Sequence, residues 1–147
     1  MKKVMPPTYF LILLIAGIFL HYVFTLNQIV PNPYNYLGII LIVWGVIINI
    51  WSDRMFKRAK TTVKPFEEPT SLITSGPYSF SRHPMYLGMI SILLGSAVVL
   101  GSLVTFIPPL IFLFIMEFIF IPKEEEMLEK AFGKNYVDYK ENVGRWV

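Results

Sequence analysis

The 147-residue chain has no cysteine, so disulfide bonds and thiolate metal sites are excluded. Its two histidines, His21 and His83, stand far apart, and the sequence therefore predicts no metal site. Two long runs also lack Asp, Glu, Lys and Arg, one between Val4 and Ser52 and the other between His83 and Met116. Each run is too long for one membrane span of roughly 20 residues and about long enough for two.

The sequence also lacks the short motifs of several enzyme classes. It has no Gly-x-Gly-x-x-Gly after a strand, no P-loop, no His-Glu-x-x-His and no Gly-x-Ser-x-Gly. Its net charge of +3 comes without a basic cluster interleaved with a base-stacking platform, so nucleic acid is not an expected partner.

What the chain does contain is apolar surface, because 54% of its residues are hydrophobic. A soluble domain of this length has no core large enough to bury so much apolar surface. We therefore predict an integral membrane protein with one all-α domain, residues 1–147, built as a four-helix bundle surrounded by membrane lipids. The sequence leaves the oligomeric state open.

Proline and glycine divide the charge-free runs into four predicted spans, at about 8–30, 36–52, 84–100 and 102–121. A Pro-Asn-Pro segment beginning at Pro31 separates the first two, because proline removes a backbone donor and restricts the residue before it. A tight turn at Gly101 separates the last two. Pro108 and Pro109 are expected to kink the fourth span near its outer end.

The charges predict how these spans are oriented. All 13 Lys and Arg residues lie on one side of the arrangement, and the connections around Pro31 and Gly101 carry no charge. The positive-inside rule makes the charged side cytoplasmic, so we expect a multi-pass protein with both chain termini in the cytoplasm.

The cytoplasmic segment 122–147 is predicted to form two short helices, 124–132 and 135–142, separated by Gly133 as a C′ residue. Aromatic side chains recur at helical spacing in this segment, at Phe132, Tyr136 and Tyr139. We expect this aromatic face to pack the segment onto the bundle or onto the lipid surface.

The segment Arg82-His83-Pro84 places a guanidinium and an imidazole at the start of the third span. Proline is favoured at the first position of a helix, so His83 is expected at the helix entrance near free backbone N–H groups. The positive end of a helix disfavours imidazolium, which favours a neutral His83 that both donates and accepts. Position alone leaves two interpretations open: a functional site, or an interfacial histidine beside an arginine that contacts lipid headgroups.

Acidic residues gather at the end of the fourth span. Glu117 is the one acidic residue inside a predicted span, where it either serves a function or snorkels to the nearby interface. Glu124 and Glu125 either oppose the dipole at a helix start or face inward. Glu117 and Glu124 are seven residues apart and share one helical stripe if Pro122 keeps the helix in phase. We take Glu117 and Arg82 as the catalytic candidates.

These motifs form a longer pattern that runs from Gly76-Pro-Tyr78 through Arg82-His83-Pro84-Met85-Tyr86-Leu87-Gly88 to Glu124-Glu125, Phe132-Gly133, Tyr136 and Tyr139. The pattern resembles the isoprenylcysteine carboxyl methyltransferase and phospholipid methyltransferase superfamily of integral membrane enzymes that use S-adenosylmethionine. The resemblance covers about residues 72–146 and agrees with the four-span layout. It implies methyl transfer from S-adenosylmethionine to a lipidic or membrane-partitioned acceptor.

The resemblance also implies a cofactor site, made of Gly76, His83, Pro84, Met85, Tyr86, Leu87, Ser91, Glu124 and Glu125. Superfamily members that act on prenylated cysteine have an arginine about one turn before the first glutamate, and Phe120 stands at that position here. The resemblance therefore leaves the acceptor open among carboxylate, amine, thiol and hydroxyl groups. An amine or hydroxyl acceptor needs a general base, for which Glu117 and Glu124 are the candidates.

Two other functions fit parts of the sequence. Membrane reductases that use NADPH on sterols or isoprenoids resemble this superfamily in their C-terminal part, but they need extra basic residues for the 2′-phosphate and more spans. A non-enzymatic membrane protein would use the same motifs to bind a partner or lipid headgroups. That alternative leaves the combined spacing of the His83, Glu124 and Gly133 motifs unexplained.

Overall fold

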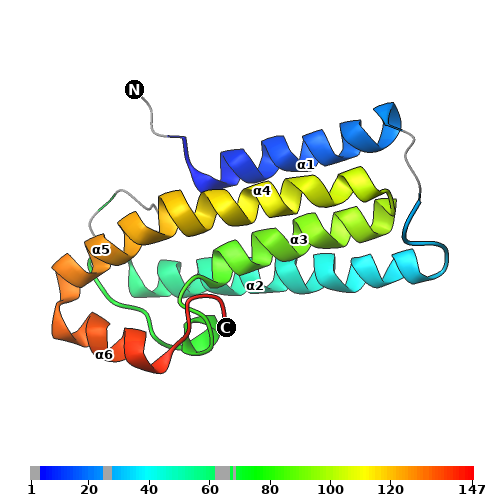
Figure 1. The fold of residues 1–147 in the computed structure, drawn as a ribbon. Helices are drawn as coiled ribbons and strands as arrows, with labels where there is room; N and C mark the ends of the chain where they lie inside the picture. Colours follow the sequence, from blue (N-terminus) through cyan, green and yellow to red (C-terminus); the bar gives the residue numbers. More distant parts are fainter. Residues whose placement is uncertain (1–3, 25–27, 62–66, 68) are drawn as a thin grey trace.

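The computed structural model shows a helical chain, of which we describe residues 4–24, 28–61, 67 and 69–147 (Figure 1). Within these residues, β pairing is limited to one isolated bridge between Gln28 and Ser102, which confirms the all-α prediction. The elements in chain order are α1 (Pro6–Val23), η1 (Tyr34–Tyr36), α2 (Leu37–Ala59), η2 (Gly76–Ser79), α3 (Pro84–Leu100), η3 (Leu103–Phe106), α4 (Ile107–Ile115), η4 (Met116–Phe120), α5 (Ile121–Phe132) and α6 (Lys134–Asn142).

Several of these helices suit a lipid environment. In the described chain, three helical stretches are long and apolar enough to cross a membrane: Pro6–Val23, Tyr34–Ala59 and Leu103–Phe132. α3 is a shorter apolar helix. Large apolar side chains such as Ile15, Phe19 and Phe118 are exposed on their outer faces. Hydrocarbon solvates such a surface and water does not, so the chain is an integral membrane protein.

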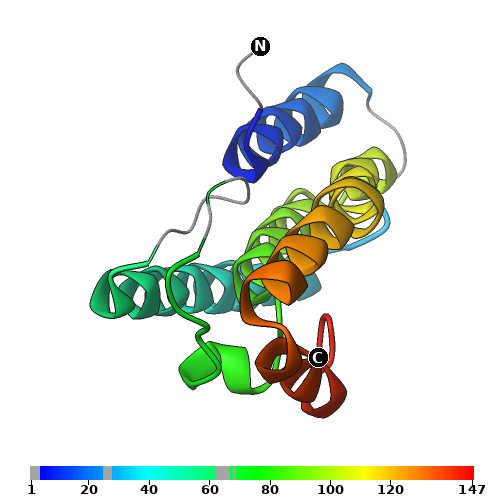
Figure 2. The ribbon, with the colours of Figure 1, turned by 90° about the vertical axis from the view of Figure 1, so that its left-hand side faces the viewer.

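α3 lies between α1 and α2 and packs against both (Figure 2). α1 also contacts α4, and the main partner of α2 is α3. One end of the bundle holds the starts of α1 and α3, the end of α2, and α5 with α6 (Figure 1). We call it the charged end, because the basic residues of α2 and the acidic residues of α5 lie there. The opposite end is formed by the turns around Pro31 and Gly101.

Glycine pairs bring α2 and α3 into backbone contact. A Cβ built on Gly45 would lie 2.5 Å from the Gly88 carbonyl oxygen, and one on Gly95 would lie 2.5 Å from the Gly38 carbonyl oxygen. No side chain fits in these gaps, so glycine at all four positions sets the distance between the helices. Gly88 closes the Arg82-to-Gly88 motif, and its structural role is this close packing.

The predicted spans agree with the helices to different extents. A helix with the bounds predicted for the span at 84–100 is present as α3, which is shorter than the three stretches of the described chain that are long enough to cross a membrane. The span predicted to end near 30 is wrong at that end, because α1 stops at Val23. The N–H groups of Ile29 and Val30 instead donate to the Gly101 carbonyl, at 2.8 and 3.2 Å. The second helix runs past the expected end at 52 to Ala59, since charged side chains are compatible with a helix that leaves the membrane.

The prolines of the stretch Leu103–Phe132 do not produce the kink that we expected near its outer end. Pro108 and Pro109 lie in the first turn of α4, so they begin this helix instead of kinking it. Pro122 has no N–H for the carbonyl four residues earlier. The turn before it, η4, is a π-helix, whose hydrogen bonds join residues five apart and so reach past the proline. The helix predicted at 124–132 is therefore the continuation of this stretch as α5.

Candidate active site

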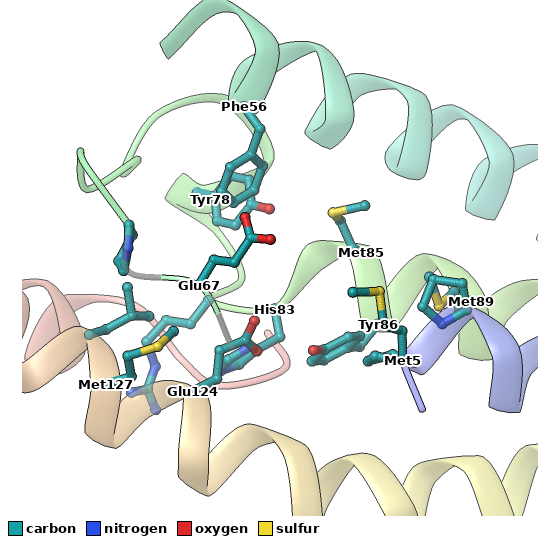
Figure 3. A pocket seen from close by; sticks show the side chains of 15 residues that line it. Met5, Phe56, Glu67, Tyr78, His83, Met85, Tyr86, Met89, Glu124 and Met127 are labelled. Atoms are coloured by element: carbon teal, nitrogen blue, oxygen red, sulfur yellow. The ribbon is translucent and has the colours of Figure 1, made fainter. Parts of the chain in front are cut away.

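A pocket opens at the charged end between the starts of α1 and α3, the end of α2, and α5 (Figure 3). Its volume of about 160 Å³ exceeds the roughly 10–15 Å³ that one water needs, so it has room for a larger molecule. Its walls are largely apolar and include Phe56 of α2 and Met85, Tyr86 and Met89 of α3. The charged or titratable residues that line it are Arg82, His83, Glu67 and Glu124.

His83 and Glu124 both line this pocket and contact each other. Pro84 begins α3 and leaves His83 as the N-cap residue, with its ring stacked on Tyr86 at a centroid distance of 5.7 Å and an interplanar angle of 4°. His83 Nδ1 lies 3.3 Å from Glu124 Oε2. The start of α3 and the helix α5 thus meet at this site.

The second ring nitrogen of His83 also meets a carboxylate, with Nε2 placed 3.5 Å from Glu125 Oε1. Burial lowers the pKa of His83, but the hydrogen bonds and charges of Glu124 and Glu125 outweigh it and raise the pKa above its usual value. The two carboxylates thus favour imidazolium at His83, whereas the helix dipole alone favours the neutral form that we expected.

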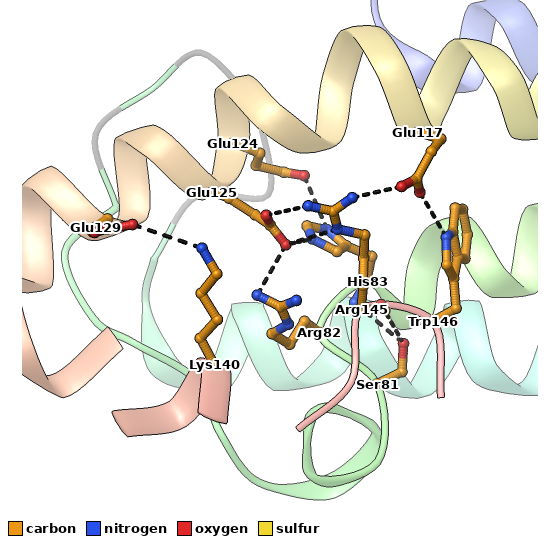
Figure 4. Close-up of polar contacts among 10 residues, drawn as sticks. All are labelled: Ser81, Arg82, His83, Glu117, Glu124, Glu125, Glu129, Lys140, Arg145 and Trp146. Atoms are coloured by element: carbon orange, nitrogen blue, oxygen red, sulfur yellow. Dashed lines mark hydrogen bonds and ion pairs between the residues drawn. The ribbon is translucent and has the colours of Figure 1, made fainter. Parts of the chain in front are cut away.

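Glu125 is the centre of a buried charge cluster beside the pocket (Figure 4). Its Oε1 lies 3.0 Å from Arg82 Nη1. Arg145 adds two hydrogen bonds, from Nη2 to Oε2 at 2.8 Å and from Nε to Oε1 at 3.2 Å. Glu125 is therefore in contact with two guanidinium groups and the His83 ring.

Glu117 lies outside the residues that line this pocket. Its Oε1 accepts a hydrogen bond from Arg145 Nη1 at 2.5 Å, and its Oε2 accepts one from the Trp146 indole N–H at 2.8 Å. Glu117 thus shares its partner with Glu125 and not with Glu124. The expected stripe is displaced by one residue, because the π turn η4 inserts extra chain between Glu117 and α5.

The other predicted site residues divide into two groups. Arg82, Met85 and Tyr86 join His83 and Glu124 in the pocket lining. The structure places five outside that lining: Gly76, Pro84, Leu87, Ser91 and Glu125. Pro84 is fully buried, and the Ser91 hydroxyl donates to the Leu87 carbonyl at 2.8 Å. Gly76, with φ of 63°, packs against Trp51 of α2.

The chain is similar to known proteins over more than half of its length. Residues 34–135 match the phospholipid methyltransferase family, which is more than half of the chain. The chain belongs to the phospholipid methyltransferase family. This match confirms the superfamily resemblance that the Arg82 and Glu124 motifs indicated.

The relatives of this chain include isoprenylcysteine methyltransferases. It is 32% identical over 114 residues to protein-S-isoprenylcysteine O-methyltransferase A of Arabidopsis thaliana, covering 75% of this chain and 57% of that protein. It is 31% identical over 115 residues to the Saccharomyces cerevisiae protein-S-isoprenylcysteine O-methyltransferase, covering 74% of this chain and 46% of that protein. The chain thus spans about half the length of these relatives.

A solved structure shares the fold of this family member. It is described as the eukaryotic intramembrane Ras methyltransferase ICMT, isoprenylcysteine carboxyl methyltransferase. The TM-score is 0.60 at 24% sequence identity, over 96% of this chain and 51% of that chain.

Sequence reasoning missed two residues of the cluster in this family member, Arg145 and Trp146. No spacing rule links them to Glu117 or Glu125, which are 28 and 20 residues from Arg145. The signal available was composition, because an arginine and a tryptophan follow each other at the predicted membrane surface. Of the expected aromatic face, Tyr136 is fully buried and the Tyr139 hydroxyl donates to the Tyr78 carbonyl at 2.6 Å, whereas Phe132 is half-buried.

Proposed function

We propose that this chain transfers a methyl group from S-adenosylmethionine to a lipidic or membrane-partitioned acceptor in the pocket at the charged end. The observation that carries the proposal is the His83–Glu124 pair, which faces a largely apolar cavity at the end of a membrane bundle. Membership of the phospholipid methyltransferase family supports it. So do the relatives named as O-methyltransferases.

The side chains of the pocket fit the chemistry of this cofactor. Met85, Tyr86 and Met89 offer apolar surface of the kind that packs against a flat adenine ring. Glu124 supplies a carboxylate for a cationic group, and Arg82 supplies a guanidinium for an anionic one. S-adenosylmethionine would contribute an electrophilic methyl group on a sulfonium cation.

The chain itself would bind, orient and dry the reactants. His83 would hold the Glu124 carboxylate through its Oε2 atom, where the carboxylate lines the pocket. The apolar walls exclude water, and in-line displacement gains most from such alignment in a dry site. Among the acidic candidates, Glu124 reaches the pocket and is the one we propose as base for an amine or hydroxyl acceptor.

Acceptor and cofactor would reach the site from different phases. Met5 and Pro6 at the start of α1 line the pocket, so its apolar wall continues onto a membrane helix. A membrane-partitioned acceptor would enter along this surface. The cofactor would enter from the water at the charged end, which the positive-inside rule makes cytoplasmic together with both chain termini.

Binding experiments in detergent test the cofactor. We expect the parent protein to bind S-adenosylmethionine by calorimetry, and we expect His83→Ala and Glu124→Ala each to weaken binding by about tenfold or more. Glu126→Ala is the matched control, because Glu126 is the exposed neighbour of the cluster and pairs with Lys130. Equal affinity in all four proteins would rule out this placement of the cofactor.

A transfer experiment tests the reaction. The protein is incubated with S-adenosylmethionine labelled in its methyl group and a total lipid extract of the host, and the labelled product is identified. Transfer to a membrane-partitioned molecule is the expected result. A rise of the melting temperature with NADPH and none with S-adenosylmethionine would instead identify a reductase.

A further inference from the structure

Residues 143–147, which we call the final segment, fold back under the pocket. The Arg82 backbone N–H donates to the Gly144 carbonyl at 3.0 Å, and the Ser81 hydroxyl donates to the Arg145 carbonyl at 3.4 Å. The Trp146 side chain packs against the buried core beneath the site. The backbone of the final segment is therefore attached to the loop that presents Arg82 and His83.

Arg145 uses this position to join two carboxylates of the fourth membrane stretch. Its guanidinium donates to Glu117 on one side and makes two bonds to Glu125 on the other (Figure 4). A two-bond contact between arginine and a carboxylate fixes the plane of the carboxylate as well as its distance. Trp146 holds the second oxygen of Glu117, so Glu117 in turn fixes the guanidinium.

Glu125, which Arg145 holds in place, contacts two residues that line the pocket. The same Oε1 atom that receives Arg145 Nε lies 3.0 Å from Arg82 Nη1 and 3.5 Å from His83 Nε2. The Glu125 side chain is only 6% exposed, so no bulk water replaces a lost partner. A rotation of Glu125 would therefore release both pocket residues together.

We propose that Arg145 is a positioning residue that, through Glu125, holds Arg82 and His83 in their places at the pocket. Glu117 and Trp146 anchor Arg145 for this role. The arrangement of the cluster stands on its own geometry, and its effect on S-adenosylmethionine binding rests on the proposed function. In this proposal Glu117, which we predicted as catalytic, has a structural role beside the site, because it holds Arg145.

The pKa of His83 reports whether Glu125 stays in place. Charged and titratable groups face this ring from several elements: Glu124 and Glu125 from α5, Arg82 from the preceding loop, Tyr86 from α3, and Arg145 from the final segment through Glu125. Removing the Arg145 cation while Glu125 stays would raise the His83 pKa further. Moving Glu125 away would lower it.

Histidine NMR titration in detergent separates these cases cleanly, because the chain has two histidines and His21→Gln assigns the signals. We expect Arg145→Ala to lower the His83 pKa relative to the parent protein. Arg58→Ala, which removes an exposed cation at the end of α2, is expected to leave it unchanged. An unchanged or higher His83 pKa in Arg145→Ala would overturn the positioning role.

Two further variants guard against a folding defect. Arg145→Lys keeps the charge but lacks the planar fork that makes two bonds to Glu125. Glu117→Gln removes the anchor while Arg145 remains. Each variant should lower the His83 pKa less than Arg145→Ala does. S-adenosylmethionine affinity should fall about tenfold in Arg145→Ala. If no protein binds S-adenosylmethionine, the proposed function fails, and the NMR titration still decides the role of Arg145.

Discussion

The Glu117 and Glu125 carboxylates share the guanidinium of Arg145, although eight residues separate them along one continuous helical stretch. In a regular α-helix, side chains eight apart point roughly 80° away from each other. The π turn η4 unwinds the stretch between them and returns Glu125 to the face of Glu117. The same displacement turns Glu124 toward the pocket, so the π turn sets which of the two neighbouring carboxylates lines it.

Loss of the Glu125 charge should destabilise the protein strongly. Glu125→Gln would leave the buried Arg82 guanidinium without its carboxylate, which typically costs about 3 kcal/mol or more in free energy of unfolding. Thermal unfolding in detergent, followed by circular dichroism, measures the change. Glu126→Gln is the matched control at the next position, where the Lys130 pair is exposed and no measurable shift is expected. Equal melting temperatures in the two variants would contradict the cluster.

The His83 contacts should make stability depend on pH. Because folding raises the pKa of His83 above 6.5, the imidazolium contacts stabilise the fold fully at pH values below 6.5. Their contribution is lost as pH rises through the raised pKa of the folded state. Stability measured from acidic to alkaline pH should therefore decline more in the parent protein than in His83→Gln. Parallel curves for the two proteins would show that His83 is not charged in the folded state.

Glycine packing between α2 and α3 should tolerate no added methyl group. Gly45→Ala places a Cβ against the Gly88 carbonyl, so the helices must separate, at a cost of about 1–3 kcal/mol in free energy of unfolding. Gly17→Ala is the matched control, because its Cβ would meet Pro108 at an ordinary 3.4 Å. Thermal unfolding of both variants in detergent tests this. A larger loss in Gly17→Ala would exclude the packing role.

Membrane orientation can be tested with single cysteines, because the chain has none of its own. We expect Arg58→Cys, at the charged end, to be protected from a membrane-impermeant maleimide in intact cells. Tyr34→Cys, exposed at the opposite end, should be labelled. Both cysteines should react after the membrane is permeabilised, which controls for accessibility. The reverse pattern in intact cells would place the pocket on the outer side of the membrane.

Much of the fold followed from patterns that are local in sequence. The span at 84–100 is bounded by a proline that begins a helix and a glycine that ends one, and both signals act within one turn. The end of α1 was not predictable in this way. Its last expected residues pair with Gly101, which lies more than 70 positions further along the chain. Long-range pairing of this kind leaves no local periodicity.

In the candidate site too, local sequence patterns identified some residues and long-range contacts decided the others. His83 and Glu124 were identifiable because the motif that contains them has a characteristic residue order. Arg145 was not identifiable, since a single arginine near the end of the chain carries no spacing signal. The neutral state expected for His83 considered only the local helix dipole, whereas the two carboxylates that raise the His83 pKa come from α5.

The sequence by itself determined that the chain is a helical membrane protein and which motif residues are candidates for its site. Apolar runs, prolines and charge asymmetry act locally or along the membrane normal, so composition and order suffice to specify them. Only the tertiary structure decided which carboxylate meets which cation. That choice depends on the phase of a helix after its π turn and on the return of Arg145 to Glu117 and Glu125, and both are properties of packed elements in three dimensions.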